Sequence, residues 1–406
     1  MNTISTANTT GSAARSRVVV AGGGLGAVRT VEELRALGHT GPVTVLCEES
    51  EPPYDRPPLT KRVLAGTLDA VPLWAPGRPE SLEVRVLRGT AAAALDADRR
   101  EVVDGRGGRH GFDHLVVATG AEPRVPPVVG AELLRTIRDL RDAHALRDIL
   151  APGADLVVIG GGVLGCEVAA TAAGLGCRVV LVEAGRTLME RAVGAVLGDR
   201  LAAVHRGHRV DVRCATSVTE VARTADGRCQ VRLTDGTEVT ADAVVAAVGV
   251  RPRTDWLAGR GGPVLDDGVL CDAWCRASLP GVYAVGDVCR WTHPVTGVTR
   301  REEHWSAAGE QAGIVAHQIL GLPGGPVMHG VLPYFWSDQY DLKIQVLGRP
   351  GTAPGPPGIE EWDRPGALLA RFHDDDGRPV AAVGFCAGAR LMRLRTGLLP
   401  DLEGAS

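Results

Sequence analysis

Short apolar runs recur along the chain, and two of them are followed by the same pattern: a glycine-rich loop, a helix pattern and a second apolar run. The first series occupies residues 18–21, 25–37 and 43–47, and the second occupies residues 156–159, 163–175 and 178–182. Buried strands that alternate with helices are typical of parallel sheets in α/β proteins. The pattern therefore predicts two strand–loop–helix–strand units.

The remaining patterns predict how these units are connected. Strand patterns at 114–119 and 281–285 lie on either side of the second unit, which therefore looks inserted into the first. Further patterns predict a polar helix at 139–150, a hairpin at 231–240 with Asp235-Gly236 at its turn, a buried strand at 243–248 and a helix at 304–320. From Pro333 onward the chain is aromatic and strand-rich, with a Pro/Gly loop at 348–358.

We predict an α/β fold with two Rossmann-like dinucleotide-binding domains and a C-terminal α+β domain. The first domain comprises residues 17–125 and 250–325, the second 126–249 and the C-terminal domain 326–406, after a disordered tail at 1–16. A chain of 406 residues is long enough for several domains with full cores.

The two glycine-rich loops carry the candidate chemistry. They read Gly22-x-Gly24-x-x-Ala27 and Gly160-x-Gly162-x-x-Gly165. The first glycine permits a tight turn, the second lets the backbone approach a pyrophosphate, and the third position lets helix and strand pack closely. Unpaired N–H groups at the helix N-terminus then face the phosphates. One such loop is also compatible with a plain turn, but two in the same context indicate that the chain binds two dinucleotides.

A carboxylate follows the returning strand of each unit, Glu48 in the first and Glu183 in the second. A carboxylate at this place accepts hydrogen bonds from a ribose diol. Glu183 would repel a 2′-phosphate, which favours NADH over NADPH. Arg186 and Arg191 lie close by in the sequence, and either could reach a phosphate.

Composition narrows the function classes. The net charge of −4 leaves no nucleic-acid footprint and no polybasic membrane segment. No apolar run approaches the ~18 residues of a transmembrane helix, and residues 1–16 lack the hydrophobic stretch of a signal peptide. Nine cysteines at irregular spacing fit a reduced protein of the cytoplasm.

Several segments together resemble the FAD- and NADH-binding ferredoxin reductases of the putidaredoxin reductase type, which have the two-dinucleotide fold of glutathione reductase. The resemblance extends from about Arg17 to Leu399. The matching segments are PYDRPPLTK (53–61), ATGAEPR (118–124), GGGVLGCEVAATA (160–172), VGVRPRTDWLA (248–258), GVYAVGDV (281–288), EHWSAAGEQ (303–311) and PYFWSDQYDLKIQVLG (333–348). The last two are specific to this branch of flavoproteins.

The resemblance implies a cofactor for each domain. FAD would occupy the first domain, with its pyrophosphate at Gly22, Gly24 and Gly26, its ribose at Glu48, its adenine end at Ala92 and its ribityl chain at Gly286 and Asp287. Further FAD contacts would come from Arg56, Thr119, Gly120, Arg124, Gly249, Trp305 and Trp336, although either tryptophan could instead be a core residue. NADH would occupy the second domain at Gly160, Gly162, Gly165 and Glu183.

Lys61 and Glu167 are the candidate catalytic residues. Lys61 and Lys343 are the only lysines of the chain. Reduced flavin develops negative charge, which a buried ammonium at Lys61 would stabilise. Glu167 follows the second loop on an otherwise apolar helix face, so it needs a partner if buried, and Lys61 is the expected one. The alternatives are that Lys61 is an ordinary surface lysine and that Glu167 is an acid favoured by the dipole near the N-terminus of its helix.

Cysteine and histidine spacing bears on the route of the electrons. The chain has no Cys-x-x-Cys or Cys-x4-Cys pair that could reduce a disulphide. Cys271, Cys275, Cys289 and His293 can be drawn as a zinc pattern, but the resemblance gives the segment between them to the flavin, so we predict no metal site. His205-x-x-His208 is expected at a solvated helix end.

The resulting hypothesis is a reductase that passes electrons from NADH through FAD to a [2Fe–2S] ferredoxin, which serves a cytochrome P450 or another oxygenase. An arginine patch near the flavin would dock the acidic ferredoxin, with Arg56, Arg290, Arg300 and Arg301 as candidates. A flavoenzyme that acts directly on a small molecule or on oxygen is one alternative. A redox-sensing interaction protein, similar to the apoptosis-inducing-factor relatives, is the other.

Overall fold

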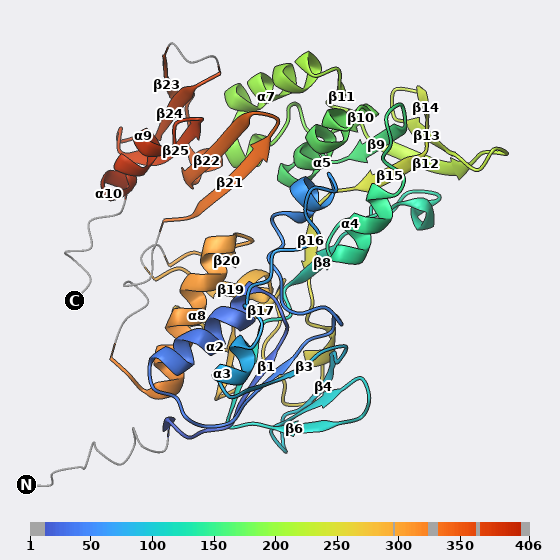
Figure 1. Cartoon of the computed structure of the whole chain (residues 1–406). Coiled ribbons are helices and arrows are strands. Elements are labelled where there is room, and N and C mark those ends of the chain that lie inside the picture. Colours follow the sequence, from blue (N-terminus) through green and yellow to red (C-terminus); the bar gives the residue numbers. More distant parts are fainter. Residues whose placement is uncertain (1–12, 295–296, 324–331, 363–365, 399–406) are drawn as a thin grey trace, which may run out of the picture.

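A computed structural model of the protein describes residues 13–294, 297–323, 332–362 and 366–398. Figure 1 shows three units: one formed by the N-terminal segment together with residues near 300, a second formed by the middle of the chain, and a C-terminal sheet. Residues 1–12 of the predicted tail lie outside the described residues. The rest of that tail is in contact with the first unit, since Ala14 O accepts a 2.7 Å hydrogen bond from Thr40 N–H.

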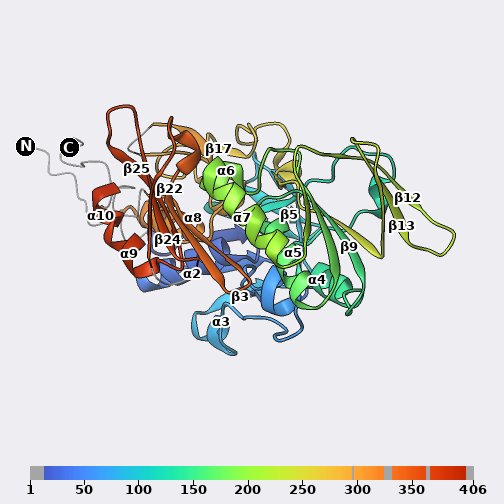
Figure 2. The same cartoon turned by 90° about the horizontal axis from the view of Figure 1, so that it is seen from above.

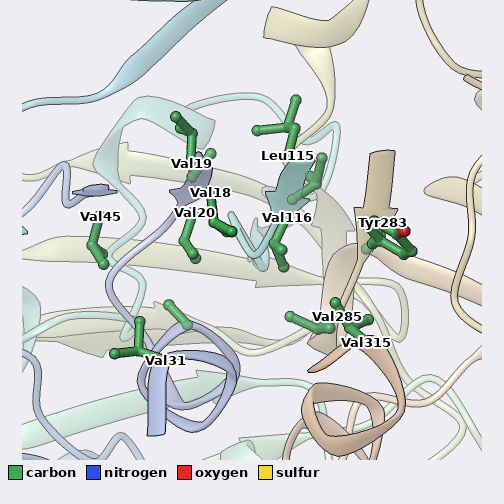
Figure 3. Packing of buried hydrophobic residues seen from close by; sticks show 14 of the residues in the cluster. Val18, Val19, Val20, Val31, Val45, Leu115, Val116, Tyr283, Val285 and Val315 are labelled. Atoms are coloured by element: carbon green, nitrogen blue, oxygen red, sulfur yellow. The ribbon is translucent and has the colours of Figure 1, made fainter. Parts of the chain in front are cut away.

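The first unit is built on a five-stranded parallel sheet in the order β18-β7-β1-β2-β3. Its strands are β1 (Val18–Ala21), β2 (Val43–Leu46), β3 (Val84–Leu87), β7 (His114–Val117) and β18 (Val282–Ala284). Helices α2 (Leu25–Ala36) and α8 (Trp305–Leu320) pack side by side. Figure 3 shows Val31 of α2 and Val315 of α8 against the valines of the sheet.

Smaller elements complete the first unit. They are a three-stranded sheet of β4 (Ala92–Asp96), β5 (Glu101–Asp104) and β6 (Arg109–Gly111), another of β17 (Val269–Cys271), β19 (Cys289–Thr292) and β20 (Thr299–Arg301), the helix α3 (Arg78–Ser81) and the short 3-10 helices η3 (Asp255–Leu257) and η4 (Gly286–Val288). The segment 59–63 forms a π-helix, η1 (Leu59–Val63).

The second unit is built on a four-stranded parallel sheet in the order β11-β10-β9-β15. The sheet and its helices comprise α4 (Leu140–Arg147), β9 (Asp155–Ile159), α5 (Val163–Gly174), β10 (Arg178–Val182), α6 (Glu190–Val193), α7 (Ala195–Gly207), β11 (Asp211–Arg213) and β15 (Ala243–Ala246). An antiparallel sheet of β12 (Val218–Arg223), β13 (Cys229–Leu233) and β14 (Glu238–Ala241) and the 3-10 helix η2 (Ala131–Leu133) lie beside it.

Two short strands join the first and second units. β8 (Ala121–Pro123) leaves the first unit, β16 (Val250–Pro252) returns to it, and the two pair in antiparallel fashion. The first sheet gains β18 only after this return. The structure thus confirms the prediction that the second unit is inserted into the first.

The C-terminal unit is a five-stranded antiparallel sheet in the order β21-β22-β25-β24-β23. Its elements are β21 (Tyr334–Gln339), β22 (Leu342–Gly348), η6 (Pro350–Thr352), β23 (Gly358–Glu361), β24 (Leu368–His373), β25 (Pro379–Phe385), α9 (Gly388–Arg393) and α10 (Arg395–Leu398). Figures 1 and 2 show this sheet beside the second unit, and residues of both units belong to one hydrophobic cluster. β21 also contacts α8 of the first unit, so this strand meets both dinucleotide units.

The structure confirms the predicted fold class and each predicted strand–loop–helix–strand unit. It also confirms the hairpin turn at Gly236, where φ is +83°. The exact domain boundaries stay a prediction. Within the ranges that the structure describes, no helix is long and apolar enough to cross a membrane.

Candidate cofactor site

A cavity of about 1000 Å³ lies between the three units. Most of the predicted site residues line it: Gly22, Gly24, Gly26, Glu48, Arg56, Lys61, Ala92, Thr119, Gly120, Gly162, Glu167, Gly249, Gly286, Asp287, Trp305 and Trp336. Arg124, Gly160, Gly165 and Glu183 do not line it. One cavity therefore receives residues from both glycine loops and from the C-terminal sheet.

The first glycine loop crosses the end of β7 at close range. Gly22 has φ +130°, and a Cβ there would lie 2.1 Å from the Ala118 carbonyl oxygen, so only glycine fits. At Gly24 a Cβ would meet nothing within 4 Å, which leaves room for a ligand next to the backbone. Ala27, in the third position, is fully buried with its methyl group in the core.

The second glycine loop repeats this geometry. Gly160 has φ +104°, and its Cβ would lie 2.4 Å from the Ala247 carbonyl oxygen, while a Cβ at Gly162 would meet nothing within 4 Å. The third position differs from that of the first loop. A Cβ at Gly165 would lie 1.8 Å from the Gly160 carbonyl oxygen, so α5 approaches the loop more closely than an alanine permits.

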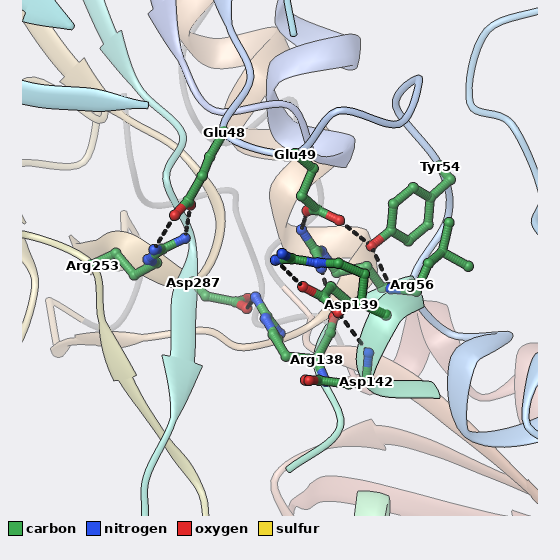
Figure 4. Close-up of polar contacts among 11 residues, drawn as sticks. Glu48, Glu49, Tyr54, Arg56, Arg138, Asp139, Asp142, Arg253 and Asp287 are labelled. Atoms are coloured by element: carbon green, nitrogen blue, oxygen red, sulfur yellow. Dashed lines mark hydrogen bonds and ion pairs between the residues drawn. The ribbon is translucent and has the colours of Figure 1, made fainter. Parts of the chain in front are cut away.

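The two carboxylates that follow β2 and β10 have different partners. Glu48 accepts from both terminal nitrogens of Arg253, at 2.8 Å from Nη2 and also from Nη1 (Figure 4). Glu183 accepts from two backbone N–H groups, those of Gly161 at 2.5 Å and Gly185 at 2.6 Å. Glu183 is thus bonded directly to the second glycine loop. Arg186 points to Glu190 at 3.6 Å, and Arg191 lines the cavity.

A second polar group lines the cavity near Asp287 (Figure 4). Asp287 accepts from Arg138 at 2.9 Å, and Arg56 donates to the Arg138 carbonyl oxygen at 2.6 Å and to Glu49 at 2.6 Å. The Tyr54 hydroxyl also donates to Glu49, and burial raises the pKa of Tyr54. Arg56 therefore belongs to a fixed network at the cavity wall.

Lys61 and Glu167 form the buried ion pair that the sequence predicts, with Nζ 2.8 Å from Oε2. Glu167 is 1 % exposed and pairs with Lys61, so Lys61 is not a plain surface lysine. Thr60 and Ser337 also donate to Glu167, at 2.6 Å and 2.7 Å. Lys61 lies in the π-helix η1, a form that is frequent at functional sites. The catalytic role of the pair stays a prediction.

Aromatic side chains line the cavity where α8 begins. Trp305 is 38 % exposed and donates from Nε1 to Asp55 at 2.8 Å, so it is not a core residue. The Trp305 and Trp336 rings meet edge to face with centroids 5.9 Å apart. The rings of His304 and Phe335, which also line the cavity, stack with centroids 5.0 Å apart, and burial lowers the pKa of His304.

The arginines that the sequence proposes for a docking patch are distributed over several ion pairs. Arg290 pairs with Asp266 at 2.7 Å, and Arg301 pairs with Glu303 at 2.7 Å. Arg300 lines the cavity and shares the buried Glu302 with Arg349, a partner that the sequence does not predict. Burial, followed by the charge of Arg300, lowers the pKa of Arg349 to about 10. The docking patch stays a prediction.

The expectation that His205 lies at a solvated helix end is wrong. His205 is 0 % exposed and hydrogen-bonds to Gln339 at 3.0 Å and Tyr340 at 2.9 Å. The spacing of Leu197, Leu201 and His205 places all three on the buried face of α7, and that pattern could have revealed it. Arg138, Arg253, Ser337 and Gln339 have no comparable signal, because each also contacts a residue far away in the sequence.

Cysteines contribute little to the cavity. All nine are described, all are free thiols, and only Cys47 lines the cavity, where burial raises its pKa to about 12. Cys271, Cys275 and Cys289 are buried in the core of the first unit. Among the described residues, no group of three or more His, Cys, Asp or Glu side chains could hold a metal ion.

The fold and the cavity define an oxidoreductase with two dinucleotide cradles. Residues 16–312 match the pyridine nucleotide-disulphide oxidoreductase family, and the chain belongs to that family. Its membership agrees with one flavin and one pyridine nucleotide in the two cradles.

Within this family, the chain is similar to reductases of ferredoxins over most of its length. The chain is 35 % identical to the ferredoxin–NAD(+) reductase component of the p-cumate 2,3-dioxygenase system of Pseudomonas putida, over 90 % of this chain and 88 % of the relative. It is 33 % identical to putidaredoxin reductase of Pseudomonas putida, over 82 % of this chain and 81 % of the relative. The crystal structure of the covalent putidaredoxin reductase–putidaredoxin complex matches with a TM-score of 0.86, at 30 % identity over 94 % of this chain and 93 % of the other.

Proposed function

We propose that this protein is an NADH-dependent, FAD-containing reductase that delivers electrons to a [2Fe–2S] ferredoxin. The observation that carries the proposal is the Lys61–Glu167 pair, which lines one cavity together with residues of both glycine loops. Donor and acceptor dinucleotides bound in the two cradles would therefore meet beside this pair. The relatives named above are ferredoxin reductases, which supports the same class of acceptor.

Unpaired donors among the residues that line the cavity support a bound dinucleotide. Trp256 and Arg349 line it, and within the described part of the chain Trp256 Nε1 and Arg349 Nε are buried donors without a partner. Gly24 leaves open space beside the N-terminus of α2. Bound FAD would supply the step from two-electron to one-electron transfer. Lys61 would place its positive charge beside the ring where negative charge develops.

The cysteines favour an external acceptor over a disulphide. Only Cys47 lines the cavity, and no cysteine of the described chain stands beside it as a resolving partner. Trp305 lines the cavity and is 38 % exposed, so it would offer an electron route to a bound partner. We propose that a cytochrome P450 or another oxygenase then receives the electrons from the ferredoxin. Free thiols throughout agree with a place in the cytoplasm.

Preference for NADH rests on Glu183. Both carboxylate oxygens accept backbone N–H groups, so the charge is held next to the second loop, where it would repel a 2′-phosphate. Arg186 is paired with Glu190 instead of facing the loop. We propose that Glu183→Gln narrows the ratio of kcat/KM for NADH to that for NADPH by about tenfold. An unchanged ratio would remove Glu183 from the selectivity.

The deciding experiment measures reduction of cytochrome c by NADH with and without added [2Fe–2S] ferredoxins. The visible spectrum of the purified protein should show the flavin, and ferredoxin should stimulate the reaction. Stimulation by oxygen or a small molecule alone would favour a direct flavoenzyme. A flavin that NADH reduces only very slowly, with a long-lived charge-transfer complex, would favour a redox-sensing interaction protein.

A further inference from the structure

A chain of buried hydrogen bonds extends from the Lys61–Glu167 pair into the C-terminal unit. Glu167 Oε2 faces Lys61 and Thr60, whereas Oε1 accepts only from Ser337 Oγ, at 2.7 Å, among the contacts that the structure describes. Behind Ser337, Gln339 Nε2 donates to its Oγ at 3.1 Å. The C-terminal sheet thus supplies the donor for one of the two oxygens of this carboxylate.

The series of hydrogen bonds continues into the second unit. The Gln339 side-chain oxygen lies 3.0 Å from His205 Nε2, and the Tyr340 hydroxyl lies 2.9 Å from His205 Nδ1. Because the amide oxygen can only accept, His205 carries its proton on Nε2 and Nδ1 accepts from Tyr340. Every donor in the series therefore points toward Glu167.

Burial keeps this direction fixed. Ser337, Gln339 and His205 are each at most 1 % exposed. Burial lowers the pKa of His205 to about 4, so the imidazole is neutral near pH 7 and holds one tautomer. His208 stacks on Tyr340 with ring centroids 3.6 Å apart, which fixes the far end.

The sequence of β21 explains how a strand can supply this series. Side chains alternate across a strand, so Ser337 and Gln339 share one face and Asp338 lies on the other. Buried polar groups are costly unless each is paired, and apolar residues would fill the same space without that requirement. The series cannot conduct a proton, because the side-chain amide of Gln339 does not release its protons. The arrangement is suited to orienting a carboxylate by aligned dipoles.

We propose that Ser337 is a positioning residue for the Lys61–Glu167 pair, and that Gln339, His205 and Tyr340 align its hydroxyl from behind, so that the C-terminal unit sets the charge geometry beside the flavin. The proposal rests on the proposed function, because it requires that the pair face a bound flavin. The C-terminal unit would then influence the reduction potential of the flavin, in addition to any role in docking the ferredoxin.

The test uses the full-length holoenzyme and two measurements, the rate of flavin reduction by NADH in a single turnover and the two-electron midpoint potential of the flavin. Ser337→Ala removes the donor to Oε1. Loss of a hydrogen bond to a charged group should slow reduction about tenfold and weaken the stabilisation of reduced flavin by the same factor, a fall of about 30 mV in potential. Ser337→Thr, which keeps the hydroxyl, should restore both values.

Two further variants separate positioning from packing. Asp338→Asn changes the neighbouring residue on the opposite face of β21, whose contact with Lys343 is a 3.9 Å surface pair, and should leave both measurements unchanged. Gln339→Met removes the alignment behind Ser337 and should lower the potential by a smaller amount. If Ser337→Ala fails to fold, the potential of Gln339→Met decides, and an unchanged value there overturns the proposal.

Glu167→Gln distinguishes a failure of the Ser337 proposal from a failure of the proposed function. If it shifts the potential while Ser337→Ala does not, Ser337 only fills space and the proposal is overturned, with the proposed function intact. If neither Glu167→Gln nor Lys61→Met shifts the potential, the pair does not face the flavin and both fail. A protein without flavin would overturn the proposed function directly.

Discussion

The two glycine loops share one plan and differ in how tightly each is closed. Gly22 and Gly160 both lie against a carbonyl oxygen with positive φ, and both second glycines open onto free space. The third positions differ, because Ala27 packs its methyl group in the core while Gly165 touches the Gly160 carbonyl oxygen. The carboxylates differ too: a guanidinium holds Glu48, whereas backbone N–H groups hold Glu183.

A shared motif therefore fixes the backbone path of the two loops but not the surroundings of the ligand. The first cradle is built with a charged side chain, Arg253, that crosses from a segment 205 residues away. The second is built from its own backbone, since Glu183 bonds to Gly161 and Gly185. This contrast agrees with our proposal that the first cradle holds FAD and the second takes NADH.

The largest effect should come from exchanging the residues at the third positions of the two loops. Gly165→Ala places a Cβ 1.8 Å from a backbone oxygen and should reduce the free energy of unfolding by roughly 3 kcal/mol or more. Ala27→Gly removes one buried methyl group and should cost about 1 kcal/mol. Thermal or denaturant unfolding of the two variants measures this. Equal losses would contradict the closer approach of α5 to its loop.

The next largest effect should be a loss of stability at low pH, which should be greater in the second unit than in the first. The pKa of His205 in the folded second unit is about 4, below its ordinary value of 6.5, because of burial first and then His208. As pH falls from 6.5 to about 4 the unfolded state binds a proton that the folded state does not, so stability falls by up to roughly 3 kcal/mol and then levels off. Unfolding curves across this pH range measure the loss.

His39 provides the matched position in the first unit. Burial, then the charge of Arg35, also lowers its pKa, although by less than at His205. His205→Gln should therefore flatten the acid dependence more than His39→Gln does. The reverse order would show that acid sensitivity resides in the first unit.

Alanine substitutions at Gly24 and Gly162 should affect the binding of different ligands. Neither Gly24 nor Gly162 has positive φ or a neighbour within 4 Å, so both variants should fold normally. Gly24→Ala should lower the flavin content of the purified protein, while Gly162→Ala should keep the flavin and raise KM for NADH about tenfold. If Gly162→Ala lost flavin instead, the assignment of the two cradles would be reversed.

The smallest effect should come from Arg186. Its pair with Glu190 spans 3.6 Å and its side chain is 77 % exposed, so it contributes little to the second cradle. Arg186→Ala should change kcat/KM for NADH by less than about twofold. A larger loss in steady-state rates would mean that Arg186 reaches the bound nucleotide.

Much of this arrangement follows from local pattern. Apolar runs and glycine spacing predict both units, and an acid on an apolar helix face predicts the pairing of Glu167 with Lys61. Long-range partners do not follow, because nothing local connects Glu48 to Arg253 or Glu167 to Ser337. The π-helix at Lys61 does not follow either, since one extra residue in a turn leaves no mark on hydrophobic periodicity.

The pairing of β8 with β16 has a consequence for how the protein is made. β7 leaves the ribosome long before its neighbour β18, and the whole second unit is synthesised between them. Until then the edge of β7 has no partner strand, and such edges are prone to aggregation. Once the second unit is folded, β8 and β16 hold its two ends together, so the remaining strand is delivered beside the waiting sheet at little entropic cost. Correct biogenesis of the first unit therefore depends on prompt folding of the second.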